Sequence, residues 1–270
     1  MTAAETAFAP RLIEKDYFCT VLLEYLEAAD DALVFKGGTC LAKVHAGFYR
    51  LSEDLDFVIP MPIKASRSER SARASGMKKA LTALPRHPPA FRIVQPLTGA
   101  NSSTQYIAAV GYTSQLSRQE DTIAIEVGLR EPLLTPVLSG LAQTILLDPV
   151  SGQPLVKPST VRCMSRTEAF AEKFRAALSR REVAIRDFFD IDYAVRHLDL
   201  RPHDVELVRL VRRKLAAPGH VSVDVSEHRL AALRQQLEPQ LKPVLRASDF
   251  AEFDLERAFG TVAEMATKME

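Results

Sequence analysis

The sequence predicts an α+β protein, with strands and helices in its N-terminal part and only helices in its C-terminal part. Apolar runs of strand length, several of them alternating with polar residues, fall between residues 32 and 129. After residue 165, apolar residues instead recur at helical spacing. Residues 132–164 are rich in proline and glycine and predict a seam. We therefore expect an α/β domain at residues 1–160 and a helical domain at residues 161–270.

The composition excludes several classes of protein. With 270 residues, 47% of them hydrophobic and 26% charged, the chain is typical of globular proteins rather than disordered ones. A net charge of +1 gives no global attraction to nucleic acid. The three cysteines, Cys19, Cys40 and Cys163, show no CxxC spacing and predict neither a disulfide framework nor a zinc site. Without a signal-peptide pattern or an apolar run of about 18 residues, a cytoplasmic protein with no membrane partner is expected.

The N-terminal elements follow in order along the chain. Residues 10–29 form an amphipathic pattern and predict a helix that packs on the domain. A strand at residues 32–35, a short helix at about 40–46 and a strand at 52–57 come next. Further strands are expected at 91–94, 105–112 and 122–129, and residues 141–147 predict a short strand or helix.

A glycine pair, Gly37-Gly38, connects the first strand to the short helix. Glycine lets the backbone approach a ligand closely because no Cβ intervenes. The free N–H groups at the start of the following helix suit an anion. The segment Lys36 to Thr39 therefore predicts a phosphate-binding loop.

Three acids on two strands predict a metal site. Side chains alternate along a strand, so Asp54 and Asp56 share one face, roughly 7 Å apart. Two such carboxylates suit Mg²⁺, which takes oxygen ligands and often shares them with phosphates. Glu126 occupies the face of its strand that carries the smaller residues and is expected to be the third acid, the alternatives being a cation partner or open solvent.

The segment 61–92 carries eight basic residues against one acid, Glu69, a local charge of about +7. We expect a helix over residues 66–84, and the prolines that follow it, Pro85, Pro88 and Pro89, predict a loop. The basic face of this helix is either an ordinary solvated surface or a surface that follows an RNA backbone or a triphosphate. The RNA-binding candidates are Arg67, Arg70, Arg73, Lys78 and Lys79.

In the C-terminal part, Ser165 to Glu168 fits a capping box that begins a helix. A second helix runs through about residues 185–195, and further helices are expected at 204–216, 226–236 and 250–268. From spacing alone, Lys173 and Asp187 could be either a surface ion-pair cluster or functional groups. Surface ion pairs are the leading interpretation of Asp190 and Asp192.

Taken together, these motifs resemble the nucleotidyltransferase toxins of the AbiEii/AbiGii group, and the MenT toxins are similar. The motifs span residues 14 to about 195: Glu14-Lys15-Asp16-Tyr17, Lys36-Gly37-Gly38-Thr39 with Leu41, Lys43 and Arg50, Ser52 to Phe57, Ile125-Glu126-Val127, Leu129 to Pro132, Ala171-Glu172-Lys173, Arg181, and Arg186 to Asp190. One departure is Gly38-Thr39, where many members of the superfamily carry Gly-Ser, although a hydroxyl is kept.

The resemblance implies a nucleotidyltransferase-like mixed sheet with flanking helices, followed by an α-helical domain. It implies transfer of a nucleotide from an NTP, with Mg²⁺ or alternatively Mn²⁺, to the 3′ end of a tRNA, which blocks translation and growth. It also implies a cognate antitoxin protein as a partner.

The resemblance also assigns roles to residues. Asp54, Asp56 and Glu126 would hold the metal, and Lys173 and Asp187 would join them as catalytic residues. The residues expected to contact the nucleotide are Lys36, Gly37, Gly38, Thr39, Arg50, Ser52 and Lys173. Two other classes of function stay open: nucleotide transfer to a protein or small molecule, and a catalytically inactive nucleotide- or antitoxin-binding module.

Overall fold

The computed structural model describes residues 2–86, 91–217 and 222–269. The chain divides into two compact units, Met1–Met164 and Ser165–Glu270. The expected boundary between residues 160 and 161 falls inside the last strand of the first unit, Ser159–Cys163. Pro88 and Pro89, which helped to predict a loop after the basic helix, lie outside the described residues.

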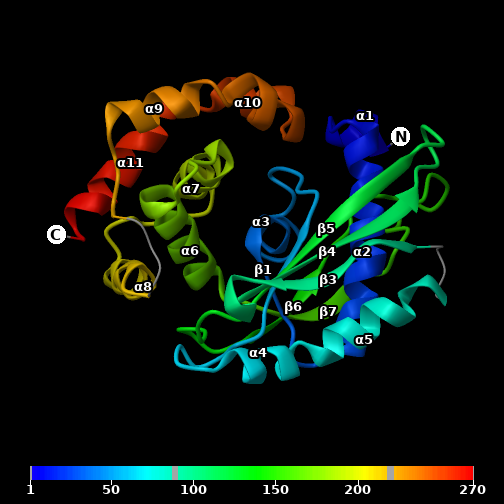
Figure 1. Ribbon diagram of the computed structural model, residues 1–270. Helices are drawn as coiled ribbons and strands as arrows, with labels where there is room; N and C mark the ends of the chain where they lie inside the picture. The colour runs from blue at the N-terminus through cyan, green and yellow to red at the C-terminus, as the bar shows by residue number, and fades with distance from the viewer. Residues whose placement is uncertain (1, 87–90, 218–221, 270) are drawn as a thin grey trace. The chain divides into compact units, whose positions relative to one another are not determined.

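A seven-stranded mixed sheet, counted over the described ranges, forms the centre of the first unit in the order β3-β4-β5-β2-β1-β7-β6 (Figure 1). The strands are β1 Val34–Lys36, β2 Leu55–Val58, β3 Arg92–Ala100, β4 Gln105–Thr113, β5 Glu120–Gly128, β6 Leu138–Ala142 and β7 Ser159–Cys163. Strand β1 runs parallel to β7, and β2 runs parallel to β5, whereas the other neighbours are antiparallel. The predicted mixed sheet with flanking helices is confirmed.

The helices of the first unit are α1 Thr2–Thr6, α2 Pro10–Ala29, α3 Gly37–Cys40, α4 Arg67–Arg73 and α5 Ser75–Ala83. A π-helical turn, Leu41–His45, directly continues α3. The helix expected over residues 66–84 is divided between α4 and α5 because Ser75 and Gly76, both poor helix formers, follow the break at Ala74.

Apolar side chains between α2, α5 and the sheet form the core of the first unit. Phe18 of α2 stacks on Tyr112 of β4, with ring centroids 4.0 Å apart. Tyr25 of α2 donates a hydrogen bond to the carbonyl of Ala80 in α5. The alternation predicted for β5 is observed, since Ile123, Ile125 and Val127 are buried while the residues between them are not. One face of β5 therefore belongs to the core and the other can carry function.

Strands β6 and β7 lie in the segment that the sequence predicted to be a seam. Strand β7 alternates as expected for a strand, with Val161 and Cys163 buried, but it has only five residues and follows a proline-rich stretch. It contains no continuous apolar run, so periodicity did not distinguish it from a loop. Its position beside β1 brings residue 163 next to the start of the chain's glycine motif.

The second unit is helical, as predicted. Its helices are α6 Arg166–Ser179, α7 Ile185–His197, α8 Val205–Leu215, α9 Glu227–Arg234, α10 Ala247–Glu252 and α11 Leu255–Thr267. The helix expected at 250–268 is divided because Asp254 caps α11, accepting a hydrogen bond from the backbone N–H of Arg257. None of the helices in the described ranges is long and apolar enough to cross a membrane.

A buried ion pair connects α6 to α8. Ser165 caps α6 by accepting a hydrogen bond from the backbone N–H of Glu168, as the capping-box pattern predicted. The carboxylate of Glu168 contacts the ammonium of Lys214 at 2.8 Å, and both residues are buried. A buried charge needs such a partner, so Glu168 also joins the two helices.

Candidate active site

Two of the predicted acids lie side by side on neighbouring parallel strands. Asp56 in β2 is the register partner of Glu126 in β5. The residues flanking them, such as Leu55 and Val127, point into the core, whereas Asp56 and Glu126 are only half-buried. Asp54 comes directly before β2, two residues from Asp56, and is also half-buried. Adjacent strands lie about 4.8 Å apart, so this face of the sheet presents a group of carboxylates.

The glycine motif packs directly against this carboxylate group. Lys36, the last residue of β1, is the register partner of Asp56. Gly37 has a φ of +76°, and a Cβ there would lie 2.2 Å from Oδ2 of Asp56. Glycine is therefore required at position 37 both by the left-handed backbone and by the adjacent carboxylate. The backbone of the predicted phosphate loop thus lies against one of the predicted metal ligands.

Two residues predicted to contact the nucleotide, Thr39 and Arg50, also stabilise the glycine motif and its surroundings. Thr39 is buried, and its hydroxyl donates a hydrogen bond of 2.5 Å to the backbone carbonyl of Asp54. Arg50 is buried as well and donates to the carbonyl of Leu51. A Cβ at Gly38 would lie 2.3 Å from the Arg50 guanidinium, so this cation supports the loop closely. Lys36 and Ser52, the other two predicted nucleotide-binding residues of this unit, are half-buried.

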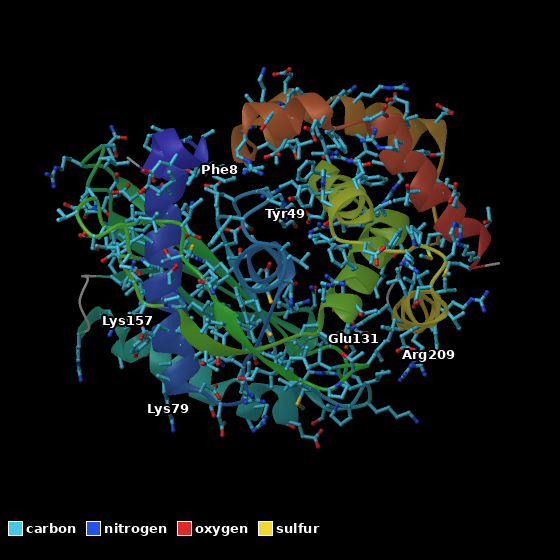
Figure 2. The ribbon with its side chains drawn as sticks, turned by 180° about the vertical axis from the view of Figure 1, so that it is seen from behind. Phe8, Tyr49, Lys79, Glu131, Lys157 and Arg209 are labelled. Atoms are coloured by element: carbon cyan, nitrogen blue, oxygen red, sulfur yellow. The ribbon has the colours of Figure 1, made fainter. Side chains whose placement is uncertain are left out.

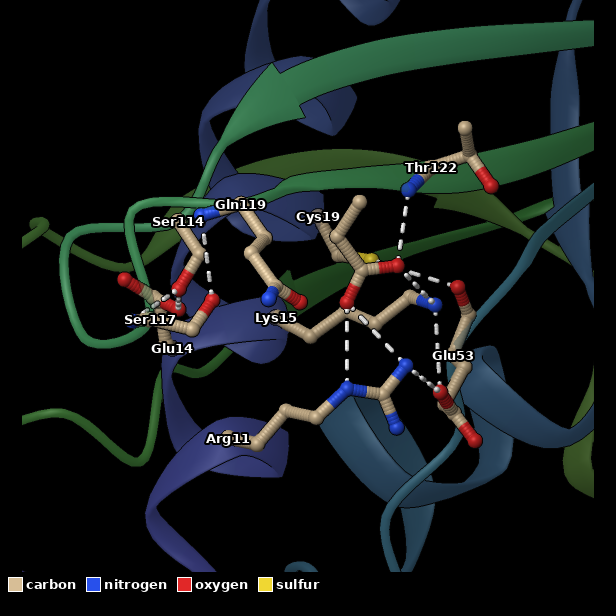
Figure 3. Close-up of polar contacts among 10 residues, drawn as sticks. Arg11, Glu14, Lys15, Cys19, Glu53, Ser114, Ser117, Gln119 and Thr122 are labelled. Carbon is tan, nitrogen blue, oxygen red and sulfur yellow. Dashed lines mark hydrogen bonds and ion pairs between the residues drawn. The ribbon is translucent and has the colours of Figure 1, made fainter.

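A polar cluster from α2 holds the residue that precedes Asp54 (Figure 3). The ammonium of Lys15 lies 3.1 Å from Glu53 and 3.4 Å from Asp121 of β5. Arg11 contacts Asp121 at 3.0 Å. The Lys15 side chain is only 7% exposed, whereas that of Arg11 is 62% exposed. The cluster connects α2, β5 and the loop before β2. It therefore restrains the backbone that leads into Asp54.

The neighbouring residues of α2 serve other parts of the same unit. Glu14 accepts hydrogen bonds from the turn between β4 and β5, including the backbone N–H groups of Gln115 and Leu116. Asp16 forms a buried ion pair of 2.6 Å with Lys43 in the π-helical turn. The family motif includes residues 14–16, but the sequence did not predict these contacts. Three consecutive charged residues on a mostly apolar helix were the feature that could have indicated them, because charged side chains are rarely buried unless they are paired.

The predicted residues of the second unit contact one another. The ammonium of Lys173 in α6 lies 2.8 Å from Asp187 and 2.8 Å from Asp190, both in α7. Asp190 is fully buried, which the surface interpretation did not anticipate. Asp192 is likewise buried and is bound by Arg257 at 2.7 Å. The expectation of surface ion pairs is therefore wrong for both aspartates, because helix packing buries both carboxylates. Arg196, four residues after Asp192 in α7, also contacts Asp192 at 2.9 Å.

The basic segment does not form one continuous exposed row. Arg67, Arg73 and Lys79 are exposed, and Lys79 is marked on α5 in Figure 2. Arg70 is buried and donates to the backbone carbonyls of Leu129 and Ile63, so its guanidinium belongs to the fold rather than to an RNA-facing surface. The ammonium of Lys78 lies 4.9 Å from the centre of the Tyr106 ring, a cation–π contact.

Comparisons with known proteins identify the family of the chain. The family model described as "Nucleotidyl transferase AbiEii toxin, Type IV TA system" matches residues 21–264. No curated protein matches the chain.

Two solved structures, both from Helicobacter pylori, have the same fold. A candidate nucleotidyltransferase from H. pylori is 17% identical, with a TM-score of 0.55 over 97% of this chain and 96% of that one. JHP933 from Helicobacter pylori is also 17% identical, with a TM-score of 0.55 over 97% and 93% of the two chains. The nucleotidyltransferase toxin MenT4 from Mycobacterium tuberculosis is 18% identical, with a TM-score of 0.41 over 95% and 92%. The family match covers most of the sequence, and the chain belongs to the AbiEii family of nucleotidyltransferase toxins from type IV toxin–antitoxin systems.

Proposed function

We propose that this toxin transfers a nucleotide from an NTP to an RNA acceptor, the 3′ end of a tRNA, and that Asp54, Asp56 and Glu126 hold the Mg²⁺ ions that the transfer requires. The pairing of Asp56 with Glu126 across parallel strands, with the backbone of Gly37 against the same carboxylate, carries this proposal. Carboxylate oxygens are the ligands that Mg²⁺, or Mn²⁺ in its place, prefers. The donor set therefore fits the ion.

In this reaction the 3′ hydroxyl of the acceptor attacks the α-phosphorus of the NTP, a new P–O bond forms and pyrophosphate leaves. Bound Mg²⁺ would neutralise charge on the phosphate oxygens and orient them. The backbone N–H groups from Gly37 onward would hold the triphosphate. Thr39 and Arg50 would act mainly by keeping the loop and Asp54 in place. Thr39 donates to the backbone carbonyl of Asp54, and Arg50 donates to that of Leu51 while its guanidinium packs against Gly38. Positioning and charge neutralisation are most of what such a transfer asks of a protein.

The family motif alone supports a role for the second unit in nucleotide binding. Lys173 would act as a point charge toward the β- or γ-phosphate. Asp187 and Asp190, each 2.8 Å from its ammonium, would hold Lys173 in one orientation. Lys173→Ala should raise the KM for the NTP while the fold survives, and unchanged kinetics would remove Lys173 from the site.

The exposed cations of α4 and α5 support an RNA acceptor, because lysine and arginine at a surface attract the phosphate backbone. Replacing Arg67, Arg73 and Lys79 with Gln together should weaken RNA binding and lower the slope of log Kd against log salt by about 2 to 3. Arg118→Gln, which removes an exposed arginine from the turn between β4 and β5, is the matched control. A wild-type salt slope in the triple variant would show that these residues form an ordinary solvated surface and do not bind RNA.

Incubation with each of four labelled NTPs, Mg²⁺ and total RNA tests the proposal directly. We expect label in the tRNA fraction, lost after 3′-terminal trimming and absent with Asp54→Ala/Asp56→Ala. Glu120→Gln, which alters an exposed acid on the same strand as Glu126, should keep the activity. Label in protein or in a small molecule instead of RNA would show that the acceptor is not RNA. No turnover of any NTP would indicate a catalytically inactive binding module.

A further inference from the structure

The fold brings together two cysteines and a histidine that are distant in the sequence. Cys40 ends α3, His45 ends the π-helical turn that follows, and Cys163 ends β7. Their ligand atoms, the two sulfur atoms and a ring nitrogen, all lie within 4.8 Å of one another. The spacing of the cysteines predicted no zinc site. Spacing could not reveal that these side chains meet, because β7, which pairs with β1 at Phe35 and Cys163, was not predicted.

We propose that Cys40, His45 and Cys163 form a binding site for a thiophilic divalent cation of the zinc class, separate from the carboxylate group proposed for Mg²⁺. Thiolate and imidazole are the ligands that zinc prefers, whereas Mg²⁺ takes oxygen. Zn–S bonds of about 2.3 Å in a tetrahedron place two sulfur atoms about 3.8 Å apart. Atoms within 4.8 Å of one another need only small adjustments to reach that arrangement.

The histidine ring is already oriented by a second contact. Its Nε2 lies 2.9 Å from the backbone carbonyl of Met164. Because a carbonyl can only accept, Nε2 carries the hydrogen and the lone pair of the neutral ring is on Nδ1. Histidines that ligate metals usually donate their other ring N–H to a carbonyl or carboxylate in this way. Nδ1 is therefore the atom assigned to the cation.

Charge and burial suit the same ion. Cys40 and Cys163 are fully buried, and His45 is half-buried. Two thiolates, a neutral imidazole and a divalent cation sum to zero charge, so the occupied site avoids an uncompensated buried charge. Among the described residues no fourth Cys, His, Asp or Glu belongs to the group. A solvent molecule on the side of His45 would complete the coordination.

The site would connect two elements on which the glycine motif depends. Cys40 follows Thr39 directly, and Cys163 lies on the strand next to β1. Gly140 of β6 lets the backbone come close at this point, since a Cβ there would lie 2.9 Å from the Cys163 sulfur. Bound cation would join α3 to β7 and stabilise the folded first unit, because a ligand that binds only the folded state shifts the equilibrium toward it.

Cobalt titration of the full-length, metal-depleted protein tests this site. The buffer contains a non-thiol phosphine reductant to keep the cysteines reduced and excess Mg²⁺ to occupy the carboxylates. We expect one equivalent of Co²⁺ to bind with thiolate-to-cobalt charge-transfer absorption, and one equivalent of Zn²⁺ to remove that absorption. Zn²⁺ should also raise the Tm.

Single substitutions test whether the cobalt absorption comes from the three proposed ligands. Cys40→Ser and Cys163→Ser should each weaken binding by more than the roughly 10–100-fold that loss of a supporting partner costs. His45→Gln should weaken binding while thiolate absorption persists at high Co²⁺. Cys19→Ser, which alters the third buried cysteine, should bind like wild type. Circular dichroism checks that each variant is folded.

Absence of thiolate–cobalt absorption in the folded, reduced wild type would overturn the proposal. So would absorption that survives Cys40→Ser and Cys163→Ser, or that is lost equally in Cys19→Ser. A Cys40–Cys163 disulfide in protein purified without reductant, with no cobalt binding after reduction, would replace the metal site by a redox pair.

Discussion

Gly37 is constrained both by its backbone conformation and by a close neighbour in the proposed active site. Its backbone is left-handed, and the Asp56 carboxylate occupies the space that a side chain would need. Gly47 has a similar φ of +67°, but a Cβ there would meet nothing within 4 Å. Substitutions at these two glycines can therefore distinguish the effect of backbone strain from the effect of a closely packed carboxylate.

Gly37→Ala and Gly47→Ala should differ in consequence. The left-handed backbone alone costs an alanine about 1 kcal/mol, and we expect Gly47→Ala to lose about that much in urea unfolding and to keep its activity. Gly37→Ala should lose more stability and should also lose Mg²⁺-dependent nucleotide transfer, because Asp56 must move. Equal activity in the two variants would contradict the close packing of the loop on the carboxylate.

Lys15 and Arg11 contact the same two acids from different depths. Lys15→Met should cost about 1–3 kcal/mol, because it leaves Glu53 and Asp121 without their buried cation. Arg11→Met should cost less than about 1 kcal/mol, because the Arg11 side chain is mostly exposed. Urea unfolding measures both. Similar losses for the two variants would show that burial does not decide the contribution of these cations.

Asp121 predicts a specific dependence of stability on pH. Burial acts to raise its pKa, but the Thr122 N–H and the cations of Lys15 and Arg11 outweigh burial, so its pKa lies below the ordinary value of 3.8. A carboxyl group with a lowered folded pKa stabilises the protein above the unfolded pKa and loses this effect as pH falls through the folded pKa. The difference in unfolding free energy between wild type and Asp121→Asn should shrink below about pH 4. A difference that stays constant from pH 7 to pH 3 would exclude this linkage.

At the scale of the secondary-structure elements, strand alternation was the most reliable predictor. It correctly placed the core face of β5 and left Glu126 on the opposite face. It could not show that Asp56 and Glu126 would be register partners, because register depends on which strands become neighbours. Strand β7 was missed because a five-residue strand after prolines carries little periodic signal, and the Cys40–His45–Cys163 group was missed with it.

Charged residues on helices were the second source of error. The spacing of Arg70 predicted a solvent-facing cation, yet its guanidinium satisfies backbone carbonyls inside the fold. The spacing of Asp190 and Asp192 predicted surface pairs, yet both carboxylates are buried. Asp190 pairs with Lys173 of α6, and Asp192 pairs with Arg257 of α11 as well as with Arg196, four residues further along its own helix. Long-range ion pairs of this kind cannot be read from spacing along one helix, because i, i+4 rules describe only neighbours on the same surface.

For the molecule as a whole, the family motif and the fold class agree. The mixed sheet, the helical second unit and the AbiEii family follow from motifs distributed along the chain. The identities of the NTP and the acceptor depend on contacts with molecules outside the chain, which residue spacing cannot specify. The central proposal is therefore chemical: the carboxylates on β2 and β5 would hold the metal ion that assists nucleotide transfer.

Mg²⁺-dependent release of pyrophosphate from NTP in the presence of RNA tests that claim most directly, with wild type compared to Asp56→Asn. The substitution keeps the shape of the side chain and removes one charge from the proposed metal site. We predict that the folded variant loses activity by at least about 10²–10³-fold, the scale at which removal of a charge-stabilising group slows an enzyme. Wild-type pyrophosphate release by folded Asp56→Asn would contradict the assignment of these carboxylates.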